Sequence, residues 1–212
     1  MIQSHSRPLL YLITDRRMLP REKNDSHLSD LIAYIRRAAA AGIDMVQIRE
    51  RDLSARDLLS VADAATSSRP ASTTTVLIND RADVAACAGA GVHLTTRSVK
   101  ADAVRKAFGP SMPIGVSTHS LEEAREAEQG GADFVVFGPV FETESKKGYG
   151  PPVGAEALRV VAARVGIPVL ALGGINLSNF REPLDCGAAG IAGISLFAKA
   201  EDLNGLVRAI KT

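Results

Sequence analysis

Eight short apolar runs, separated by amphipathic stretches, are the feature of this sequence that most restricts its fold. The runs have the length of buried strands, and the stretches between them carry apolar residues at helical spacing. Strands that alternate with helices form parallel sheets, because a parallel connection needs a crossover of a dozen or more residues. The expected strands are Leu9–Thr14, Asp44–Ile48, Thr75–Asn79, Gly91–Leu94, Pro113–Ser117, Phe134–Phe137, Pro168–Leu172 and Gly190–Ser195.

A weak internal repeat supports this pattern. The segments AAAAGIDMVQI, EQGGADFVVFG and LDCGAAGIAGI each end a helix in small residues and glycine, and then enter an apolar strand. Glycine just past a helix end is the usual left-handed cap. Eight strand–helix units in 212 residues predict one (β/α)8 TIM barrel domain over residues 1–212. The alternative is a doubly wound open sheet, which is disfavoured because no G-x-G-x-x-G follows the first strand.

Composition and charge narrow the classes of partner. The net charge of +1 gives no reason to expect nucleic acid or an acidic membrane surface. Cys87 and Cys186 lie far apart and form no C-x-x-C pair, so neither a disulfide scaffold nor a zinc site is indicated. There is no signal peptide pattern and no apolar run of membrane-spanning length, so we expect a cytoplasmic protein. The sequence does not predict its oligomeric state.

In a (β/α)8 barrel the functional groups lie where the strands end. Polar residues, glycines and a histidine collect at these ends in this sequence. They are Thr14-Asp15, Gln47 to Arg51, Asn79-Asp80, Thr95-Thr96, Ser117 to His119, Gly138-Pro139, Gly173-Gly174 and Ser195. The last two ends suit a phosphate, because glycines let backbone N–H groups approach it. A simple tight turn is the alternative for the glycine pair.

The loop after the sixth expected strand, GPVFETESKKGYGPPVG, is long for a compact domain. It offers hydroxyls and cations, including Thr143, Ser145 and Lys146, beside the expected phosphate site. We interpret it as a lid that closes over an anion. A solvated, charged loop without a function is the alternative.

Strand alternation places Gln47 and Arg49 on the same side of the second strand. An arginine that points into a barrel needs a counter-charge, because an unpaired buried charge is costly. Glu50, Asp15 and Asp80 are the candidate carboxylates, and the anion of a ligand is the other possibility.

The pair Asn79-Asp80 follows the third strand and has two interpretations. The amide and the carboxylate can contact a ligand and a metal ion. Alternatively, they can cap the next helix, since Asn and Asp are favoured at that position.

Two histidines have different settings. His93 lies inside GVHL, so we expect a buried ring with its hydrogen bonds satisfied. His119 follows a strand end in GVSTHSLEEA, and Ser120 with Glu123 has the form of a capping box for the next helix. The positive end of that helix is expected to lower the pKa of His119 and keep it neutral, as a base near pH 7 requires.

The motifs of this chain, taken in order, resemble a known superfamily. YLITD, VQIRER, LINDRADVA, GVHL, GVSTHSLEEA, GADFVVFGPVFETESKK, ALGGIN and CGAAGIAGIS together look like thiamine phosphate synthases and thiazole tautomerases, from about Tyr11 to Ser195. The resemblance implies a (β/α)8 barrel. A synthase joins a pyrimidine diphosphate to thiazole phosphate carboxylate, releasing diphosphate and carbon dioxide. A tautomerase isomerises the thiazole carboxylate phosphate by moving a proton.

The resemblance also implies residue roles. Pyrimidine diphosphate would lie against Gln47, Arg49, Arg51, Asn79, Ser117 and Lys146. Thiazole phosphate would lie against Thr143, Glu144, Ser145, Gly174, Ile194 and Ser195. Asp80 would be a Mg²⁺ ligand in a synthase, and His119 matches the acid/base of a tautomerase.

Two positions depart from the synthase pattern. Ser98 stands where a synthase has its second Mg²⁺ carboxylate, and Arg51 replaces a lysine. Mg²⁺ prefers anionic oxygen ligands, so the first change should weaken a synthase site. The prediction is therefore an isomerase, a thiazole tautomerase that uses His119 and no cofactor. The alternatives are a Mg²⁺-dependent thiamine phosphate synthase, a transferase, and a non-catalytic regulator that binds thiazole phosphate. A further alternative, outside this superfamily, is a barrel isomerase that acts on another small phosphorylated substrate.

Overall fold

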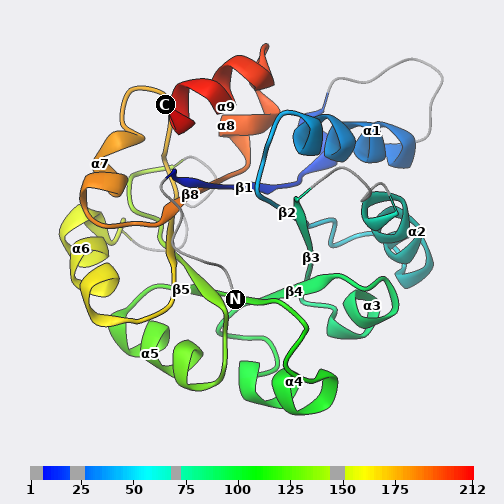
Figure 1. The fold of residues 1–212 in the computed structure, drawn as a ribbon, viewed down its shortest axis with the longest axis horizontal. Coiled ribbons are helices and arrows are strands. Elements are labelled where there is room, and N and C mark those ends of the chain that lie inside the picture. The colour runs from blue at the N-terminus through cyan, green and yellow to red at the C-terminus, as the bar shows by residue number, and fades with distance from the viewer. Residues whose placement is uncertain (1–6, 20–26, 68–72, 144–150) are drawn as a thin grey trace.

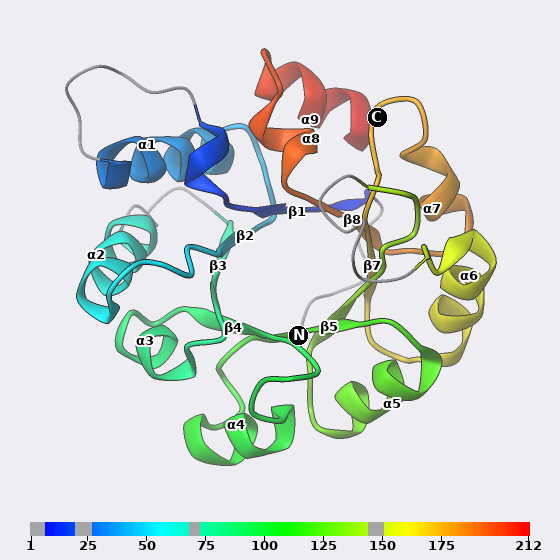
Figure 2. The same ribbon diagram turned by 180° about the vertical axis from the view of Figure 1, so that it is seen from behind.

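Eight parallel strands close into a barrel in the computed structural model, which describes residues 7–19, 27–67, 73–143 and 151–212. The strand order follows the chain, and the first strand pairs with both the second and the last. Figures 1 and 2 show the ring of strands from its two ends, with the helices outside it. The predicted (β/α)8 barrel is confirmed. The open-sheet alternative is wrong, because an open sheet has two unpaired edges and this one has none.

The elements follow one another as strand and helix along the chain. In the described residues they are β1 (Leu9–Ile13), the 3-10 helix η1 (Arg16–Met18), α1 (His27–Ala40), β2 (Met45–Ile48), α2 (Ala55–Thr66), β3 (Thr75–Asn79), α3 (Ala82–Cys87), β4 (Gly91–Leu94), α4 (Ala101–Phe108), β5 (Ile114–Thr118), α5 (Leu121–Gln129), β6 (Phe134–Phe137), α6 (Gly154–Arg164), β7 (Val169–Leu172), α7 (Arg181–Asp185), β8 (Gly190–Gly193), α8 (Ser195–Ala198) and α9 (Leu203–Lys211).

Each expected strand lies within two residues of an observed one. The largest difference is at the end of β8, which stops at Gly193 and not at Ser195. Ser195 instead begins the short helix α8, with Ile194 as its N-cap residue. The serine therefore lies on a helical turn beyond the last strand.

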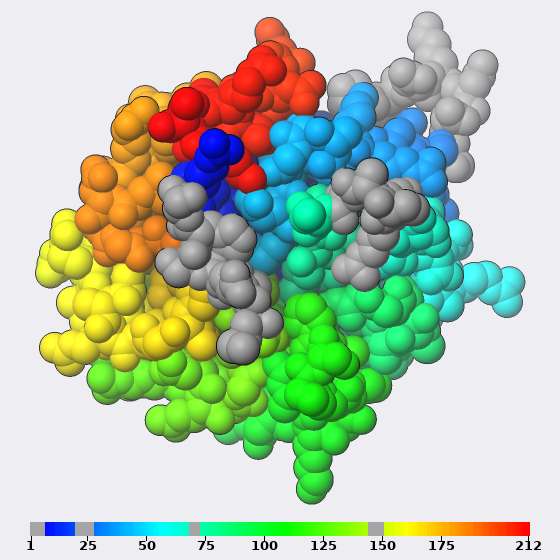
Figure 3. Space-filling model, in the orientation of Figure 1, coloured from blue at the N-terminus to red at the C-terminus, as the bar shows by residue number. Residues whose placement is uncertain are grey.

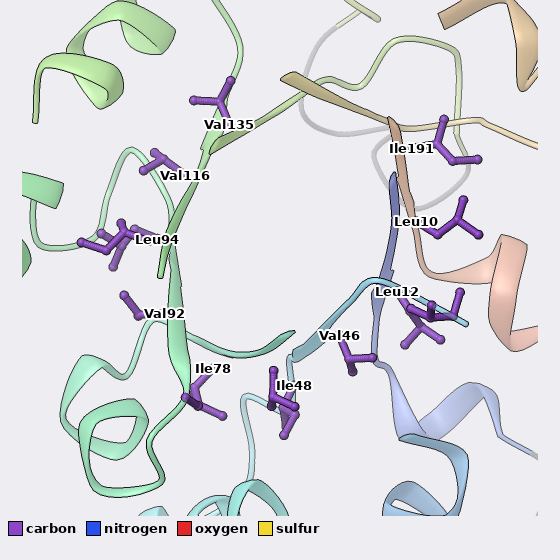
Figure 4. Close-up of a cluster of buried hydrophobic side chains, with 14 of the residues drawn as sticks. Leu10, Leu12, Val46, Ile48, Ile78, Val92, Leu94, Val116, Val135 and Ile191 are labelled. Atoms are coloured by element: carbon purple, nitrogen blue, oxygen red, sulfur yellow. The ribbon is translucent and has the colours of Figure 1, made fainter. Parts of the chain in front are cut away.

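The side chains of the strands alternate between two cores. One set points away from the barrel axis and packs under the helices, as Figure 4 shows for Leu10, Val46, Val92 and Ile191. The other set fills the barrel interior: Leu9, Tyr11, Ile13, Met45, Leu77, Phe134, Val136, Leu170 and Ala192. Burial of both sets removes apolar surface from water on the two faces of every strand. The interior is thus a packed core with no open pore through it.

The helices lie around the barrel in chain order (Figure 1), and the colours of the space-filling view follow the same order around the molecule (Figure 3). Strands with helices over their outer face and side chains over their inner face are buried on both sides. That is why they appear in the sequence as continuous apolar runs without alternation. Within the described ranges, no helix combines the length and the apolar composition needed to cross a membrane.

Two aspartates, in the segments GID and GAD, have the same role at the amino ends of β2 and β6. Asp44, just before β2, accepts hydrogen bonds from the N–H of Leu10 at 2.7 Å and from Lys211 Nζ at 2.8 Å. Asp133, just before β6, accepts from the N–H of Ile114 and from Arg105, both at 2.8 Å. Each carboxylate joins its own strand to the preceding one and is paired with a cation. These hydrogen bonds lie at the amino ends of the strands, opposite the end that carries the candidate site.

Candidate active site

A buried carboxylate ties the carboxyl ends of β1 and β2 together. Glu50 accepts hydrogen bonds from the Thr14 hydroxyl at 2.7 Å, from the Arg16 N–H at 3.0 Å and from the Arg16 guanidinium at 2.9 Å. The same guanidinium forms a two-pronged pair with Asp52, at 2.7 and 2.9 Å. Thr14 Oγ1 also accepts the N–H of Arg49 at 3.0 Å. The network fixes the backbone from which the side chain of Arg49 projects.

The carboxylates that the sequence offered to Arg49 do not form ion pairs with it. Glu50 is paired with Arg16, and Asp15 is paired with Arg17 at 3.4 Å. Within the described ranges the guanidinium of Arg49 has no carboxylate oxygen within 4.0 Å. Of the alternatives that the sequence left open, the anion of a ligand is therefore favoured.

The surroundings of Arg49 disfavour its positive charge. The side chain is half-buried, and this burial is the largest cause that lowers its pKa. The charges of Arg51 and Arg17 lower the pKa further, while Asp15 and Glu50 oppose the shift. A half-buried cation that lacks an ion pair and has other cations nearby is stabilised when a multiply charged anion binds beside it. This part of the mouth is electrostatically suited to a phosphate or diphosphate.

Gln47 lies deeper, inside the barrel. It is 2% exposed, and the described residues give its Nε2 no hydrogen-bond partner. A buried donor without an acceptor costs about 1–3 kcal/mol, so this amide is ready for an acceptor on a ligand. Asn79 ends β3 and is aligned with His93 of β4 in the register of the barrel. The two amides belong to neighbouring strands that meet at the same mouth.

His93 is buried within β4, as the sequence predicts. Its Nδ1 lies 3.0 Å from the hydroxyl of Tyr11, and its Nε2 lies 2.8 Å from the hydroxyl of Ser117. Burial lowers the pKa of His93 to about 3, and the nearby charge of Arg49 adds to the effect. The imidazole is therefore uncharged at neutral pH.

Asp80 has an unusual backbone. Its φ of 60° makes it the one non-glycine residue with positive φ in the described ranges. The N-cap position of α3 belongs to Arg81, which makes no side-chain cap bond, so the cap interpretation of Asp80 is wrong. The left-handed conformation is costly for most residues and tolerated by Asp, and it recurs at functional sites. Asp80 is exposed, with its carboxylate available to a ligand.

Ser98 supplies no substitute for a second carboxylate. Its hydroxyl accepts the N–H of Thr95 at 2.8 Å and lies 2.9 Å from the Thr95 hydroxyl, closing a local turn. The described part of the chain has no cluster of three or more His, Cys, Asp or Glu that could hold a metal by itself. Mg²⁺ is often held by one or two carboxylates plus substrate phosphates. A single carboxylate at Asp80 fits a metal ion that binds together with a diphosphate.

The glycine pair after β7 is shaped by close contacts with the segment after β6. Gly173 and Gly174 have φ of 103° and 67°. A Cβ on Gly173 would lie 2.4 Å from Pro139, and one on Gly174 would lie 2.4 Å from the carbonyl oxygen of Glu142. Only glycine satisfies both the conformation and the space. The tight-turn interpretation therefore holds, and the turn also brings backbone to the mouth.

The remaining phosphate-site residues are only partly described. Thr143 is half-buried at the end of the segment after β6. Glu144, Ser145 and Lys146 lie outside the described residues, so the predicted lid stays a prediction. Ser195 is exposed at the start of α8, the helix that follows β8.

His119 is exposed and joins two loops of the rim. Its Nδ1 is hydrogen-bonded to the carbonyl oxygen of Gly138, which follows β6. Ser120 caps α5 by accepting the N–H of Glu123 at 3.2 Å, as predicted. The carboxylate of Glu123 accepts the N–H of His119 at 2.6 Å. In a standard capping box it would accept the N–H of Ser120. The ring and the backbone N–H of His119 are thus both hydrogen-bonded, and these bonds hold the loop after β5 in place.

Comparison with known proteins decides the family. Residues 10–197 match the family model described as thiamine monophosphate synthase. The chain belongs to the thiamine monophosphate synthase family. A putative thiamine-phosphate synthase of Geobacter sulfurreducens is 43% identical, with 95% of this chain and 92% of that protein covered. A thiamine-phosphate synthase of Chlorobium phaeovibrioides is 40% identical, with 93% and 90% covered.

Solved structures agree with this family. A thiamine phosphate pyrophosphorylase from Pyrococcus furiosus is 33% identical, with a TM-score of 0.81 over 95% of this chain and 93% of that one. A 3-hexulose-6-phosphate synthase, 17% identical with a TM-score of 0.66, shares the fold.

The tautomerase prediction is wrong, and so is the assignment as an isomerase. The similar family members are named as synthases, over nearly the full length of both chains. The prediction gave too much weight to one position, Ser98, and to His119. The histidine has a structural task at the rim that does not need proton transfer, so its presence does not separate the two activities.

Sequence reasoning missed two residues that hold groups of the candidate site in place. Tyr11 and Arg16 were given no role, although Tyr11 contacts His93 and Arg16 anchors Glu50. One signal was available for Tyr11. It is a hydrogen-bonding residue in an otherwise apolar strand, at an inward-facing position.

We predict that the two carboxylates on Arg16 differ in their importance. Glu50→Gln should lower the free energy of unfolding by about 3 kcal/mol, because it removes one charge of a buried pair. Asp52→Asn is the matched control on the same guanidinium, and its exposed pair should contribute far less. Urea unfolding of the three proteins measures both effects. Equal losses for the two variants would contradict the network described here.

Proposed function

We propose that this protein is a thiamine phosphate synthase, a transferase that acts on small phosphorylated substrates. It would join a pyrimidine diphosphate to thiazole carboxylate phosphate and release diphosphate and carbon dioxide. The family membership and the synthase names of relatives that match over 90% of their length support this proposal. The observation that carries it is Arg49, a half-buried cation beside Arg51 and Arg17 without an ion pair among the described residues.

The pyrimidine half of the site is assigned to the mouth of β2, β3 and β5. Gln47 Nε2 has the unused donor that an acceptor on the pyrimidine would satisfy, and Asn79 and Ser117 stand on nearby strands. Arg49 and Arg51 would bind the diphosphate. Arginine suits this task because its planar group can donate two parallel hydrogen bonds to phosphate oxygens. Lys146, outside the described residues, is proposed as a further diphosphate contact.

Mg²⁺ is the cofactor that this proposal requires. Asp80 would hold it together with oxygens of the diphosphate, since Ser98 is engaged with Thr95. When bound, the ion supplies positive charge that neutralises the departing diphosphate. The chain's own contribution would be the positive charge of Arg49 and Arg51. The Glu50 network holds the backbone of Arg49 before any substrate arrives.

The thiazole phosphate is assigned to the opposite side of the mouth. Gly174, Ile194 and Ser195 would contact its phosphate through backbone and hydroxyl groups. Thr143, Glu144 and Ser145 are proposed to cover it from the segment after β6. The contact between Gly174 and Glu142 supports this arrangement, because it couples the phosphate turn to that segment.

A coupling assay tests the proposed function. The protein is incubated with both substrates and Mg²⁺, and thiamine phosphate and diphosphate are measured together. We expect the two products in equal amounts and a loss of both when Mg²⁺ is chelated. Asp80→Asn should lower the rate at least about a hundredfold, since the charge that the ion supplies is worth several kcal/mol. Binding of thiazole phosphate without any turnover would reject the proposal in favour of a regulator.

A second prediction concerns the glycine turn. Gly174→Ala should raise the KM for the thiazole phosphate, because the new Cβ displaces the turn from Glu142. Gly89→Ala is the matched control. Gly89 has a similar φ of 60° but has nothing within 4 Å of an added Cβ. Backbone strain should cost each variant about 1–2 kcal/mol of stability, and the collision with Glu142 should add to the loss in Gly174→Ala. An unchanged KM in Gly174→Ala would remove this turn from the thiazole site.

A further inference from the structure

Three side chains form a hydrogen-bonded chain across the barrel interior. Tyr11 of β1 contacts His93 of β4 at 3.0 Å, and His93 contacts Ser117 of β5 at 2.8 Å. Tyr11 and His93 are 0% and 2% exposed, while Ser117 is partly exposed at the mouth. This row of hydrogen bonds therefore leads from the packed core to the proposed substrate site.

Each of these hydrogen bonds can run in two directions, and burial decides between them. Tyr11 Oη has one partner in the part of the chain that the structure describes, and that partner is His93 Nδ1. The phenol otherwise meets apolar neighbours, including the ring of Phe134 at 5.5 Å in an edge-on contact. If Nδ1 carried the hydrogen, the hydroxyl hydrogen of Tyr11 would be buried without an acceptor, which is costly. Tyr11 therefore donates to Nδ1.

The direction of the first bond fixes the second. An uncharged imidazole carries one hydrogen, and with Nδ1 as the acceptor that hydrogen is on Nε2. His93 Nε2 then donates to Ser117 Oγ, which leaves the hydroxyl hydrogen of Ser117 free to point elsewhere. The partly exposed serine can direct it toward the mouth of the barrel.

We propose that Tyr11 and His93 are positioning residues that make Ser117 a hydrogen-bond donor toward an acceptor atom of the bound substrate. The acceptor is a pyrimidine nitrogen or a diphosphate oxygen, an identification that rests on the proposed function. Without Tyr11, His93 can adopt the other tautomer, with its hydrogen on Nδ1, and Nε2 can then accept a hydrogen bond from the hydroxyl of Ser117. The serine would then present only lone pairs to an acceptor, and the two would repel each other.

The tautomer is measured directly by ¹⁵N NMR of the imidazole nitrogens, with the His93 signals assigned through their absence in His93→Gln. We expect the wild-type protein to carry the hydrogen on Nε2. Tyr11→Phe should shift the population toward hydrogen on Nδ1. A wild-type ring with its hydrogen on Nδ1 would overturn the proposal. This measurement needs no turnover, so it decides the inference even if the coupling assay shows no activity.

Kinetics test the effect on the substrate. Tyr11→Phe and Ser117→Ala should each lower kcat/KM for the pyrimidine diphosphate about tenfold, the usual effect of one lost hydrogen bond. The double variant should be no worse than Ser117→Ala alone, because Tyr11 acts only through the serine. Tyr34→Phe is the matched control, because it also removes a buried tyrosine hydroxyl. Tyr34 lies on α1, away from the barrel interior, and its hydroxyl has no partner among the described residues. Additive losses in the double variant would overturn the proposal.

Discussion

Closure of the eight-stranded barrel is the constraint on which the rest of the structure depends. Closure forces every second side chain of each strand into a small shared interior. Apolar and aromatic side chains such as Phe134 and Leu170 fill most of that interior. Polar residues remain where the strands end, so groups far apart in sequence, such as Gln47 and Ser117, face one mouth. The site is built on strands whose positions are fixed by the packing beneath them.

The charged residues at the mouth of the barrel are also held in fixed positions. Glu50 is fully engaged by Arg16 and Thr14, which leaves Arg49 unneutralised on a fixed backbone. Separating the Arg16–Glu50 ion pair from the unpaired Arg49 in this way would arrange positive charge before an anion binds. Such preorganisation avoids reorganisation when the anion binds, which is the main electrostatic advantage that a folded site has over water.

Strand positions and the rim were predictable from the sequence because buried parallel strands are continuous apolar runs and polar residues follow directly after them. The partner of Glu50 was not, since Arg16 and Arg49 are both near it in the fold and only the packed geometry selects one. The role of Tyr11 was missed because a tyrosine in a strand usually indicates core. The choice of activity failed for another reason. Single residues such as Ser98 and His119 decide less than agreement over nearly the whole chain.

The proposed synthase requires a metal ion at this mouth, with Asp80 as its one carboxylate from the chain. The most direct measurement is the rate of thiamine phosphate formation as a function of Mg²⁺ for the wild-type protein and Ser98→Asp. An aspartate can keep the turn by accepting the N–H of Thr95, as the serine does now. We expect Ser98→Asp to reach half of its maximal rate at a lower Mg²⁺ concentration than the wild-type protein, because the added carboxylate is a further anionic ligand. Identical Mg²⁺ curves for the two proteins, or a wild-type rate that does not depend on Mg²⁺, would contradict it.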